Sequence, residues 1–543
     1  MKKYLKLILI GICTIAVLGG CGKKAEQDSS KKTEEMFENA VRIELSDETI
    51  LVDGVKASSD KENAVYKAND IVYYEEGHDF TYGEGTKEDE HSKEEADKHT
   101  VVHITKPGTY TISGELSYGQ IAIDLGEEAK KDETAVVNLI LDGVDINCDV
   151  APAVIFYNVY ECGSDEAEGA SKDVDTSKAG ANVYIADDTE NNVTGSYVAK
   201  IYESYELSED GTEVVDSKKL HKYDAAFYSK RTMNVNGGTK GTGVLNIVAV
   251  NEGLDSELHL TINGGIINIE SGNDGINTNE DEVSVTTVNG GTLNILVNGS
   301  TGEGDGIDSN GWLVINGGTV IAQACSDSGD AGIDSDMGIH INGGNVIATG
   351  NMLDRISEST QTYAVFSFAD RQQGENTYVL KNEADEAVFA FENTNAFTYL
   401  ILAGDKLAEG DYTLWCNDKQ CEGSSQGGFG MGRPGGNGGR GEGADFEGGA
   451  GFEDGTGFGG GKMERPEEGV IFEGMEKPDK GEMPENMEIP DRGEMPENME
   501  IPENGEMPKG MEMGPMFTGG ESSTTFTMKK GENQFMNVKV LNS

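Results

Sequence analysis

Leu313-Val-Ile-Asn-Gly-Gly318 is one of five short segments that decide the fold of this 543-residue chain. The other four share its Asn-Gly-Gly ending and are Met233-Asn-Val-Asn-Gly-Gly238, Leu260-Thr-Ile-Asn-Gly-Gly265, Thr286-Thr-Val-Asn-Gly-Gly291 and Ile339-His-Ile-Asn-Gly-Gly344. Their asparagines follow one another at steps of 27, 26, 27 and 26 residues. A fixed period of this length is typical of repeat architectures.

Apolar residues occupy fixed places on both sides of each Asn-Gly-Gly segment. Ile315 precedes its asparagine, whereas Ile267 and Ile269 follow theirs by four and six residues. Apolar positions two residues apart indicate short strands that bury one face, and Asn and Gly tolerate the positive φ of a corner. One such coil cannot bury its apolar face alone, but stacked coils share a core. The pattern therefore predicts an all-β fold, a right-handed parallel β-helix with coils roughly 4.8 Å apart.

An acidic column runs through the same rows. It consists of Glu252-Gly-Leu-Asp-Ser256, Asp274-Gly-Ile-Asn-Thr278, Asp305-Gly-Ile-Asp-Ser309 and Asp330-Ala-Gly-Ile-Asp-Ser335. Two stacked carboxylates about 4.8 Å apart repel by about 3.5 kcal/mol at an effective dielectric near 20. Such a column favours a bound cation, and hard oxygen ligands suit Ca²⁺. The candidate ligands are Asp255, Asp274, Asn277, Asp305, Asp308, Asp330, Asp334 and Asp336.

A simpler interpretation of this column needs no metal. Asp and Asn side chains also cap turns and form hydrogen-bonded ladders. That role accounts well for Asn277, Asn279 and Asn310. It accounts less well for a column that is mostly acidic, so calcium is the preferred hypothesis.

The N-terminus predicts export and anchoring. Met1-Lys2-Lys3 precedes an apolar run from Tyr4 to Leu18, and Leu18-Gly-Gly-Cys21 follows. A basic start, a short apolar core and small residues form a secretory signal. The last segment resembles a bacterial lipobox, which implies that Cys21 is lipidated and holds the protein on the outer side of the cell membrane. The alternative is an ordinary signal peptide with a chance cysteine.

Composition changes along the chain predict its organisation. The expected parts are a lipoprotein signal peptide at 1–21, a flexible tether at 22–40, a parallel β-helix at 41–350 with regular coils at 229–350, an antiparallel β cap at 351–421, a disordered insertion rich in Gly and then in Met, Pro and Glu at 422–518, and the final strand or strands of the cap at 519–543. Polar stretches at 84–98, 163–176 and 203–217 are expected to form surface loops.

Several segments together resemble a known family. They are Ile104-Thr-Lys-Pro-Gly-Thr-Tyr-Thr-Ile-Ser-Gly114, Leu141-Asp-Gly-Val-Asp-Ile146, Phe227-Tyr-Ser-Lys230, Ser359-Thr-Gln361 and the acidic rows with their Asn-Gly-Gly corners. Over roughly residues 100 to 415 the sequence is similar to the calcium-containing β-helix family of bacterial secreted carbohydrate-binding proteins. The resemblance implies a fold similar to that of pectate-type lyases, and ligands such as cellulose and acidic sugars. Where that family often has Asp-Gly-Ile-His or Asp-Gly-Ile-Lys, this chain has Asn277, Asp308 and Asp334.

Charge and cysteines narrow the possible partners. The formal net charge of −56 disfavours nucleic acid and anionic membrane surfaces as partners and favours cations. An acidic polysaccharide would need Ca²⁺ to bridge carboxylate to carboxylate. Beyond Cys13 and Cys21 the chain has Cys148, Cys162, Cys325, Cys416 and Cys421. Their spacing allows pairs 148–162 and 416–421, or free buried thiols. Oligomeric state is not indicated.

Three functions fit these features. The first is a calcium-dependent, non-catalytic polysaccharide binder whose candidate aromatic platforms are Tyr157, Tyr160, Tyr223, Tyr228 and Trp312. The second is a calcium-dependent polysaccharide lyase, which needs a base beside the acids. Residues 251–347 contain no Lys or Arg, so Lys230 and Arg231 are its nearest candidates and this function ranks second. The third is a structural surface protein or adhesin that calcium only stiffens.

Overall fold

The computed structural model describes residues 35–220, 223–425 and 521–541. The signal peptide with Cys21, most of the tether and residues 426–518 of the insertion lie outside this part. Within it, the labelled helices are the single turn α2 (Lys93–Ala96) and the 3₁₀ segment η1 (Glu127–Lys131), and nearly all other regular structure is strand. The all-β prediction is confirmed.

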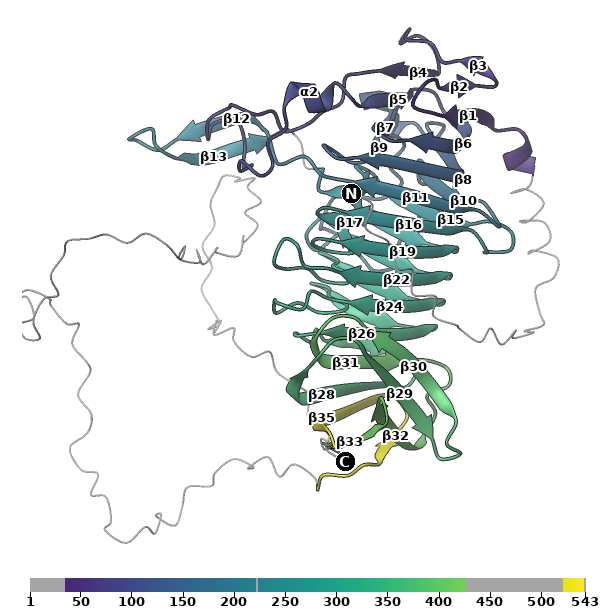
Figure 1. Cartoon of the computed structure of the whole chain (residues 1–543), viewed down its shortest axis with the longest axis vertical. Coiled ribbons are helices and arrows are strands. Elements are labelled where there is room, and N and C mark those ends of the chain that lie inside the picture. The colour runs from purple at the N-terminus through teal and green to yellow at the C-terminus, as the bar shows by residue number, and fades with distance from the viewer. Residues whose placement is uncertain (1–34, 221–222, 426–520, 542–543) are drawn as a thin grey trace, which may run out of the picture. The chain divides into compact units, whose positions relative to one another are not determined.

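Parallel strands stack row upon row, as Figure 1 shows for the strands from β11 to β26. The strand pairings form three such ladders. The first ladder contains β1 (Val41–Leu45), β6 (Gly108–Leu116), β8 (Val137–Cys148), β10 (Ala181–Ile185), β15 (Met233–Gly237), β18 (His259–Ile262), β21 (Val285–Val288), β23 (Trp312–Ile315), β25 (Gly338–Ile341) and β27 (Ile356–Ser359). The second ladder continues from β8 through β11 (Glu190–Gly195), β16 (Val244–Ala249), β19 (Ile266–Ser271), β22 (Thr292–Val297), β24 (Thr319–Gln323) and β26 (Asn345–Gly350).

The third ladder carries the acidic column. It contains β5 (Thr100–Ile104), β7 (Gly119–Asp124), β9 (Val154–Asn158), β14 (Ala225–Ser229), β17 (Glu252–Ser256) and β20 (Ile276–Thr278). Single bridges from Ile276 to Ile307 and from Ile307 to Ile333 extend it. At its start, β4 (Val65–Ala68) pairs antiparallel with β5, and the short strands β2 (Leu51–Val52) and β3 (Val55–Lys56) form a hairpin beside β1.

The registers follow the sequence period. In the first ladder Leu260 pairs with Thr286, Thr286 with Leu313 and Leu313 with Ile339, which are the first residues of the repeated segments. In the second ladder Ile267, Leu293, Val320 and Val346 stack in the same way. These apolar columns are buried in one continuous core. The parallel stacking that the period predicts is confirmed. The strand pairings alone do not define the right-handed turn or the closed coil of a β-helix.

Glycine is required at the corners that join the first two ladders. Gly291 and Gly318 have φ of +86° and +80°, values that favour glycine. A Cβ on Gly318 would lie 2.7 Å from the carbonyl oxygen of Gly291 in the preceding row. Close stacking of corner on corner therefore excludes a side chain at this position.

An antiparallel cap closes the end of the second ladder. Its strands are β28 (Tyr363–Gln372), β29 (Asn376–Asn382), β30 (Ala387–Asn393), β31 (Phe397–Ala403), β32 (Gly410–Cys416), β33 (Lys419–Ser425), β34 (Phe526–Met528) and β35 (Glu532–Val540). β31 pairs antiparallel with β26 and β28. β35 pairs antiparallel with β33 but parallel with β28, so one pair departs from the antiparallel cap that the sequence predicts. The cap has its own aromatic core around Phe366, Phe526 and Phe535. The C-terminal segment thus joins strands that precede it by more than a hundred residues.

Two boundaries and one predicted loop differ from the sequence prediction. β27 continues the first ladder to Ser359, beyond the expected end of the parallel stack at 350, because it still pairs with β25. β33 continues to Ser425, beyond the expected end of the cap at 421, because Ser424 and Ser425 pair with β35. The stretch 203–217, expected to be a loop, belongs to the hairpin of β12 (Tyr202–Leu207) and β13 (Val214–Lys219).

Candidate functional site

The third ladder brings the predicted acidic residues into register. Asp255 pairs with Asn277, and the bridges between Ile276, Ile307 and Ile333 align the residues that follow them, Asn277, Asp308 and Asp334. Because each isoleucine is buried in the core, the next side chain points to the opposite side of the strand. Each of these rows has a second aspartate shortly before its isoleucine, namely Asp274, Asp305 or Asp330. These aspartates form a second column beside the column of Asn277, Asp308 and Asp334.

Three carboxylates converge in the middle of this region. One oxygen from each of Asp305, Asp308 and Asp334 lies within 4.8 Å of the others, and each side chain is partly exposed. Two ligands of one Ca²⁺ can be at most about 5 Å apart, twice the longest usual Ca–O distance. The spacing and the hard oxygen donors therefore fit a calcium ion. Among the described residues, these three aspartates are the group of His, Cys, Asp or Glu side chains whose ligand atoms lie close enough together to hold one metal ion.

The carboxylates of this cluster hold protons more tightly than free aspartates do. Burial, followed by the charges of neighbouring aspartates, raises the pKa of Asp308 to about 6 and that of Asp334 to about 7. The same causes raise the pKa of Asp274 and Asp305 well above the ordinary value. Close carboxylates in a partly desolvated place cannot all ionise without a compensating cation.

Asp354 is an acidic neighbour that the repeat pattern did not identify. It lies between β26 and β27, and its charge raises the pKa of both Asp308 and Asp334. It follows Asp334 by 20 residues, a shorter step than those of 22, 31 and 26 residues in the acidic column, and its segment Asn351-Met-Leu-Asp354 lacks the Gly of the other rows. The shortened last row took it out of the period, so sequence spacing gave no signal for it.

The other candidate ligands have different surroundings. Asp255 is fully buried and accepts a hydrogen bond from Asn279 Nδ2 at 2.7 Å. Asn277 donates to Glu252 and Asn279, and its own Oδ1 is buried with no hydrogen-bond donor in the described structure. The column thus divides into an amide-rich part near Asp255 and Asn277 and an acid-rich part around Asp308.

Asp274, Asp330 and Asp336 lie around the cluster. Asp274 Oδ1 accepts the backbone N–H of Asp305 at 2.7 Å, and Asp330 accepts hydrogen bonds from Gly304 N–H and the Ser328 hydroxyl. Asp336 is exposed, and its charge contributes to the raised pKa of Asp308. These residues either shape the loops that present the cluster or add to its negative potential.

Comparison with known proteins decides the family. Residues 98–395 match the family described as carbohydrate-binding domain-containing proteins, which is more than half of the 543 residues. The chain belongs to that family. A relative of the same description from Acetivibrio thermocellus is 32% identical over 172 residues, which span 31% of this chain and 45% of the relative. This chain therefore matches less than half of that relative's length.

One solved structure is also similar to this family member. It is described as a polysaccharide lyase-like protein from C. thermocellum in a gadolinium derivative, and it is 20% identical with a TM-score of 0.34. The similarity covers 59% of this chain and 97% of the other.

The basic residues considered for a lyase lie away from the cluster. Ser229 pairs with Ser256, Ser256 with Thr278, and Thr278 hydrogen-bonds Ser309 in the row of Asp308. Lys230 and Arg231 therefore lie three rows before Asp308, roughly 14 Å at the usual strand spacing. The nearer cation in sequence is Arg355, which is exposed and directly follows Asp354.

Two of the five proposed aromatic platforms are core residues. Tyr223 and Tyr228 are 6% and 1% exposed, and the Tyr228 hydroxyl donates to Glu257. Tyr157 packs edge-on against Tyr223 and lies against the same core. Tyr160 and Trp312 keep partly exposed side chains. The prediction of a sugar platform is therefore wrong for Tyr223 and Tyr228, because both rings lie in the core, where they pack against each other.

The cysteines and helices add two further observations. Cys148, Cys162, Cys325, Cys416 and Cys421 are free thiols in this structure. Burial raises the pKa of Cys148 to about 12, so this thiol stays protonated.

Among the described residues, no helix has the length and apolar character needed to cross a bilayer.

The metal-free protein is expected to lose stability as pH rises from about 4 to 7. Asp308 and Asp334 have folded pKa values of about 6 and about 7, above the ordinary 3.8, so the folded state binds more protons than the unfolded state in this window. Their contribution is fully present below pH 3.8 and is lost through pH 6 to 7. Thermal melts in chelator across this range test the trend, and saturating Ca²⁺ should remove it. A melting temperature that climbs steadily with pH in chelator would contradict the prediction.

Proposed function

We propose that this chain is a cell-surface, non-catalytic polysaccharide-binding protein that uses Ca²⁺. Membership of a carbohydrate-binding family supports the polysaccharide partner. The three parallel ladders support a right-handed parallel β-helix as the scaffold, since their registers repeat once per row. The lipobox-like segment ending at Cys21 supports lipid anchoring to the outer side of the membrane.

The convergence of Asp305, Asp308 and Asp334 carries the proposal. These three would hold the ion directly. Asp274 and Asp354 interact electrostatically with the cluster and would add to the negative potential that attracts the ion. When bound, Ca²⁺ supplies a positive centre that neutralises the aspartates and accepts oxygen ligands from a sugar. Because the three side chains are partly exposed, the site can present that charge to a ligand outside the protein. The bound ion would therefore allow a chain of net charge −56 to bind an acidic polysaccharide such as pectin, which it would otherwise repel.

A calcium-dependent lyase is the second candidate. β-Elimination needs a base within hydrogen-bond reach of the proton that it removes. Lys230 and Arg231 are too far from the cluster for this role, so this candidate would use Arg355 beside Asp354 as its base. A purely structural role for calcium is the third candidate and predicts stabilisation without sugar binding.

Calorimetric titration separates these functions. The soluble chain that begins after Cys21 is titrated with hexagalacturonate in Ca²⁺ and in chelator, while absorbance records unsaturated products. Calcium-dependent binding without product is expected. Product formation would favour the lyase, and would then be tested with Arg355→Ala. Absence of binding together with a calcium-dependent rise in melting temperature would favour the structural role.

A further inference from the structure

A second polar surface lies on the outward side of the first ladder. Asn236, Asn263, Asn289, Asn316 and Asn342 form one column there, which we name the asparagine ladder. Beside it lie the outward residues of the same strands, among them Asn234, Thr261 and Thr287. This surface belongs to a different ladder from the acidic column.

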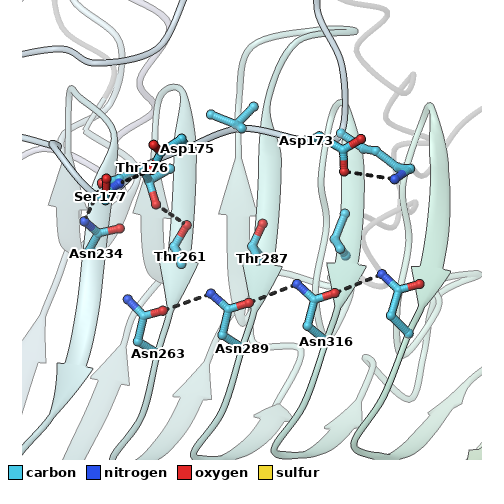
Figure 2. Close-up of a pocket in the computed structure, with 14 residues that line it drawn as sticks. Asp173, Asp175, Thr176, Ser177, Asn234, Thr261, Asn263, Thr287, Asn289 and Asn316 are labelled. Atoms are coloured by element: carbon cyan, nitrogen blue, oxygen red, sulfur yellow. Dashed lines mark hydrogen bonds and ion pairs between the residues drawn. The ribbon is translucent and has the colours of Figure 1, made fainter. Parts of the chain in front are cut away.

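Residues 172–177, which we name the strap, cross this surface (Figure 2). The strap is fastened at one end, where Asn234 Nδ2 donates to the Thr176 carbonyl and the Thr176 hydroxyl donates to Thr261 Oγ1, both at 2.8 Å. Between the strap and the asparagine ladder is a groove of about 310 Å³. Figure 2 shows Thr287 on its floor, with Asp173 and Asp175 on the strap side.

The asparagine ladder offers a regular series of hydrogen-bonding groups. Each Nδ2 donates to the Oδ1 of the preceding asparagine at 2.9 Å from Asn263 to Asn342. A primary amide has two donor hydrogens and two acceptor lone pairs, so each residue keeps one of each for a ligand. The four amides at 263, 289, 316 and 342 are exposed. They repeat once per row, at roughly 4.8 Å, which is close to the length of one pyranose ring along a glycan chain.

The inner end of the groove has an unsatisfied acceptor. Asn234 is 4% exposed, and both hydrogens of its Nδ2 are used by Thr176 and Asn182. Its Oδ1 is buried and accepts no hydrogen bond from the described residues. Figure 2 shows this oxygen on the side that faces Thr261. A buried carbonyl oxygen without a donor is costly, and a ligand hydroxyl would relieve that cost.

Charge decides which class of ligand the groove can take. Its lining has one lysine and two aspartates, and Lys172 Nζ already pairs with Asp173 at 3.0 Å. The hydroxyl and N–H of Ser177 hold the pKa of Asp175 below its usual range, so its carboxylate stays ionised. A polyanion would meet a net negative wall, whereas sugar hydroxyls can donate to carboxylates and exchange hydrogen bonds with amides.

The geometry points to this groove as a binding site for a single uncharged polysaccharide chain that lies along the asparagine ladder. It rests on the proposed polysaccharide-binding function and assigns the uncharged ligand to a second site, which uses a different surface from the calcium site and no metal. Each site can therefore fail while the other stands.

Isothermal titration of the same soluble chain, which begins after Cys21, with cellohexaose, an uncharged β-linked probe, tests this site. Binding is expected to be equal in Ca²⁺ and in chelator. Asn289→Ala removes the central amide of the ladder and should weaken binding about tenfold, which corresponds to about 1.4 kcal/mol. Asn268→Ala is the matched control, because Asn268 is the middle of a similar amide ladder with Asn246 and Asn294 on the second ladder, outside the groove.

A second variant keeps the experiment decisive if the ladder change disturbs folding. Thr287→Tyr leaves every ladder amide in place and fills the floor of the groove, so it should abolish cellohexaose binding without changing hexagalacturonate binding in Ca²⁺. The proposal is overturned if wild-type protein does not bind cellohexaose, if Asn268→Ala weakens binding as much as Asn289→Ala, or if Thr287→Tyr binds as the wild type does.

Discussion

Asp308→Asn and Asp334→Asn, combined in one chain, are expected to abolish the rise in melting temperature that Ca²⁺ produces. A ligand present at 100 times its dissociation constant stabilises a protein by about 2.7 kcal/mol, and that increment should vanish when two of the three converging carboxylates are lost. In chelator at pH 7.5 the double variant should melt above the wild type. Asparagine keeps the shape of the side chain and removes the repulsion that raises both pKa values. Differential scanning calorimetry with and without Ca²⁺ measures both effects.

Glu303→Gln is the matched control for this experiment. It also converts an acid to its amide in the loop before Asp305, but Glu303 is exposed and lies outside the converging group. It should leave the calcium effect unchanged. If the double variant retains the full calcium-dependent rise, these aspartates do not hold the ion. If it is less stable than the wild type in chelator, the carboxylates are stabilising one another through hydrogen bonds instead of repelling.

Gly318→Ala is expected to destabilise the stacked rows by about 2–5 kcal/mol. Its φ of +80° costs an alanine about 1–2 kcal/mol. In addition, the new Cβ would lie 2.7 Å from the carbonyl oxygen of Gly291 and 2.8 Å from the carbonyl carbon of Gly290. Both contacts are backbone of the preceding row, which cannot move without disturbing the register, so overpacking adds about 1–3 kcal/mol. Urea unfolding followed by circular dichroism measures the loss.

Gly302→Ala separates conformational strain from the clash. Gly302 has a similar positive φ of +98°, but a Cβ there would have no heavy atom within 4 Å. This variant should lose only about 1–2 kcal/mol, the cost of the backbone conformation alone. Equal losses in the two variants would show that the corners are not packed against each other as the structure has them.

The repeat period was enough to place the strands, and the motif shared by the rows placed most of the acids. As the period predicts, Leu260, Leu313 and Ile339 lie in one column. Asn277, Asp308 and Asp334 also share a column, although they follow one another at steps of 31 and 26 residues, because each ends the same Gly-Ile-Asx triplet. Within a stacked fold, residues one period apart must be neighbours. The spacing therefore specified the register of the rows that contain the candidate calcium site.

The sequence did not predict the parts of the calcium site and of the groove that lie outside the regular repeat. Asp354 belongs to a shortened row, and the strap comes from an irregular segment whose polar composition predicted only a surface loop. Tyr223 and Tyr228 looked like exposed platforms because no local pattern marks them as core. The shortened row and the strap do not follow the repeat, so no period indicates their contacts.

The sequence by itself determined the all-β class, the stacking of the repeated rows and the concentration of carboxylates along one column. All three follow from repeated local motifs, because equivalent positions of successive rows become neighbours when the rows stack. Only the tertiary structure decided which acids converge, what covers the asparagine ladder and where the C-terminal strand pairs. Those outcomes depend on contacts between distant, non-repeating segments, such as Thr176 with Thr261, 85 residues apart, and no short-range pattern encodes such a contact.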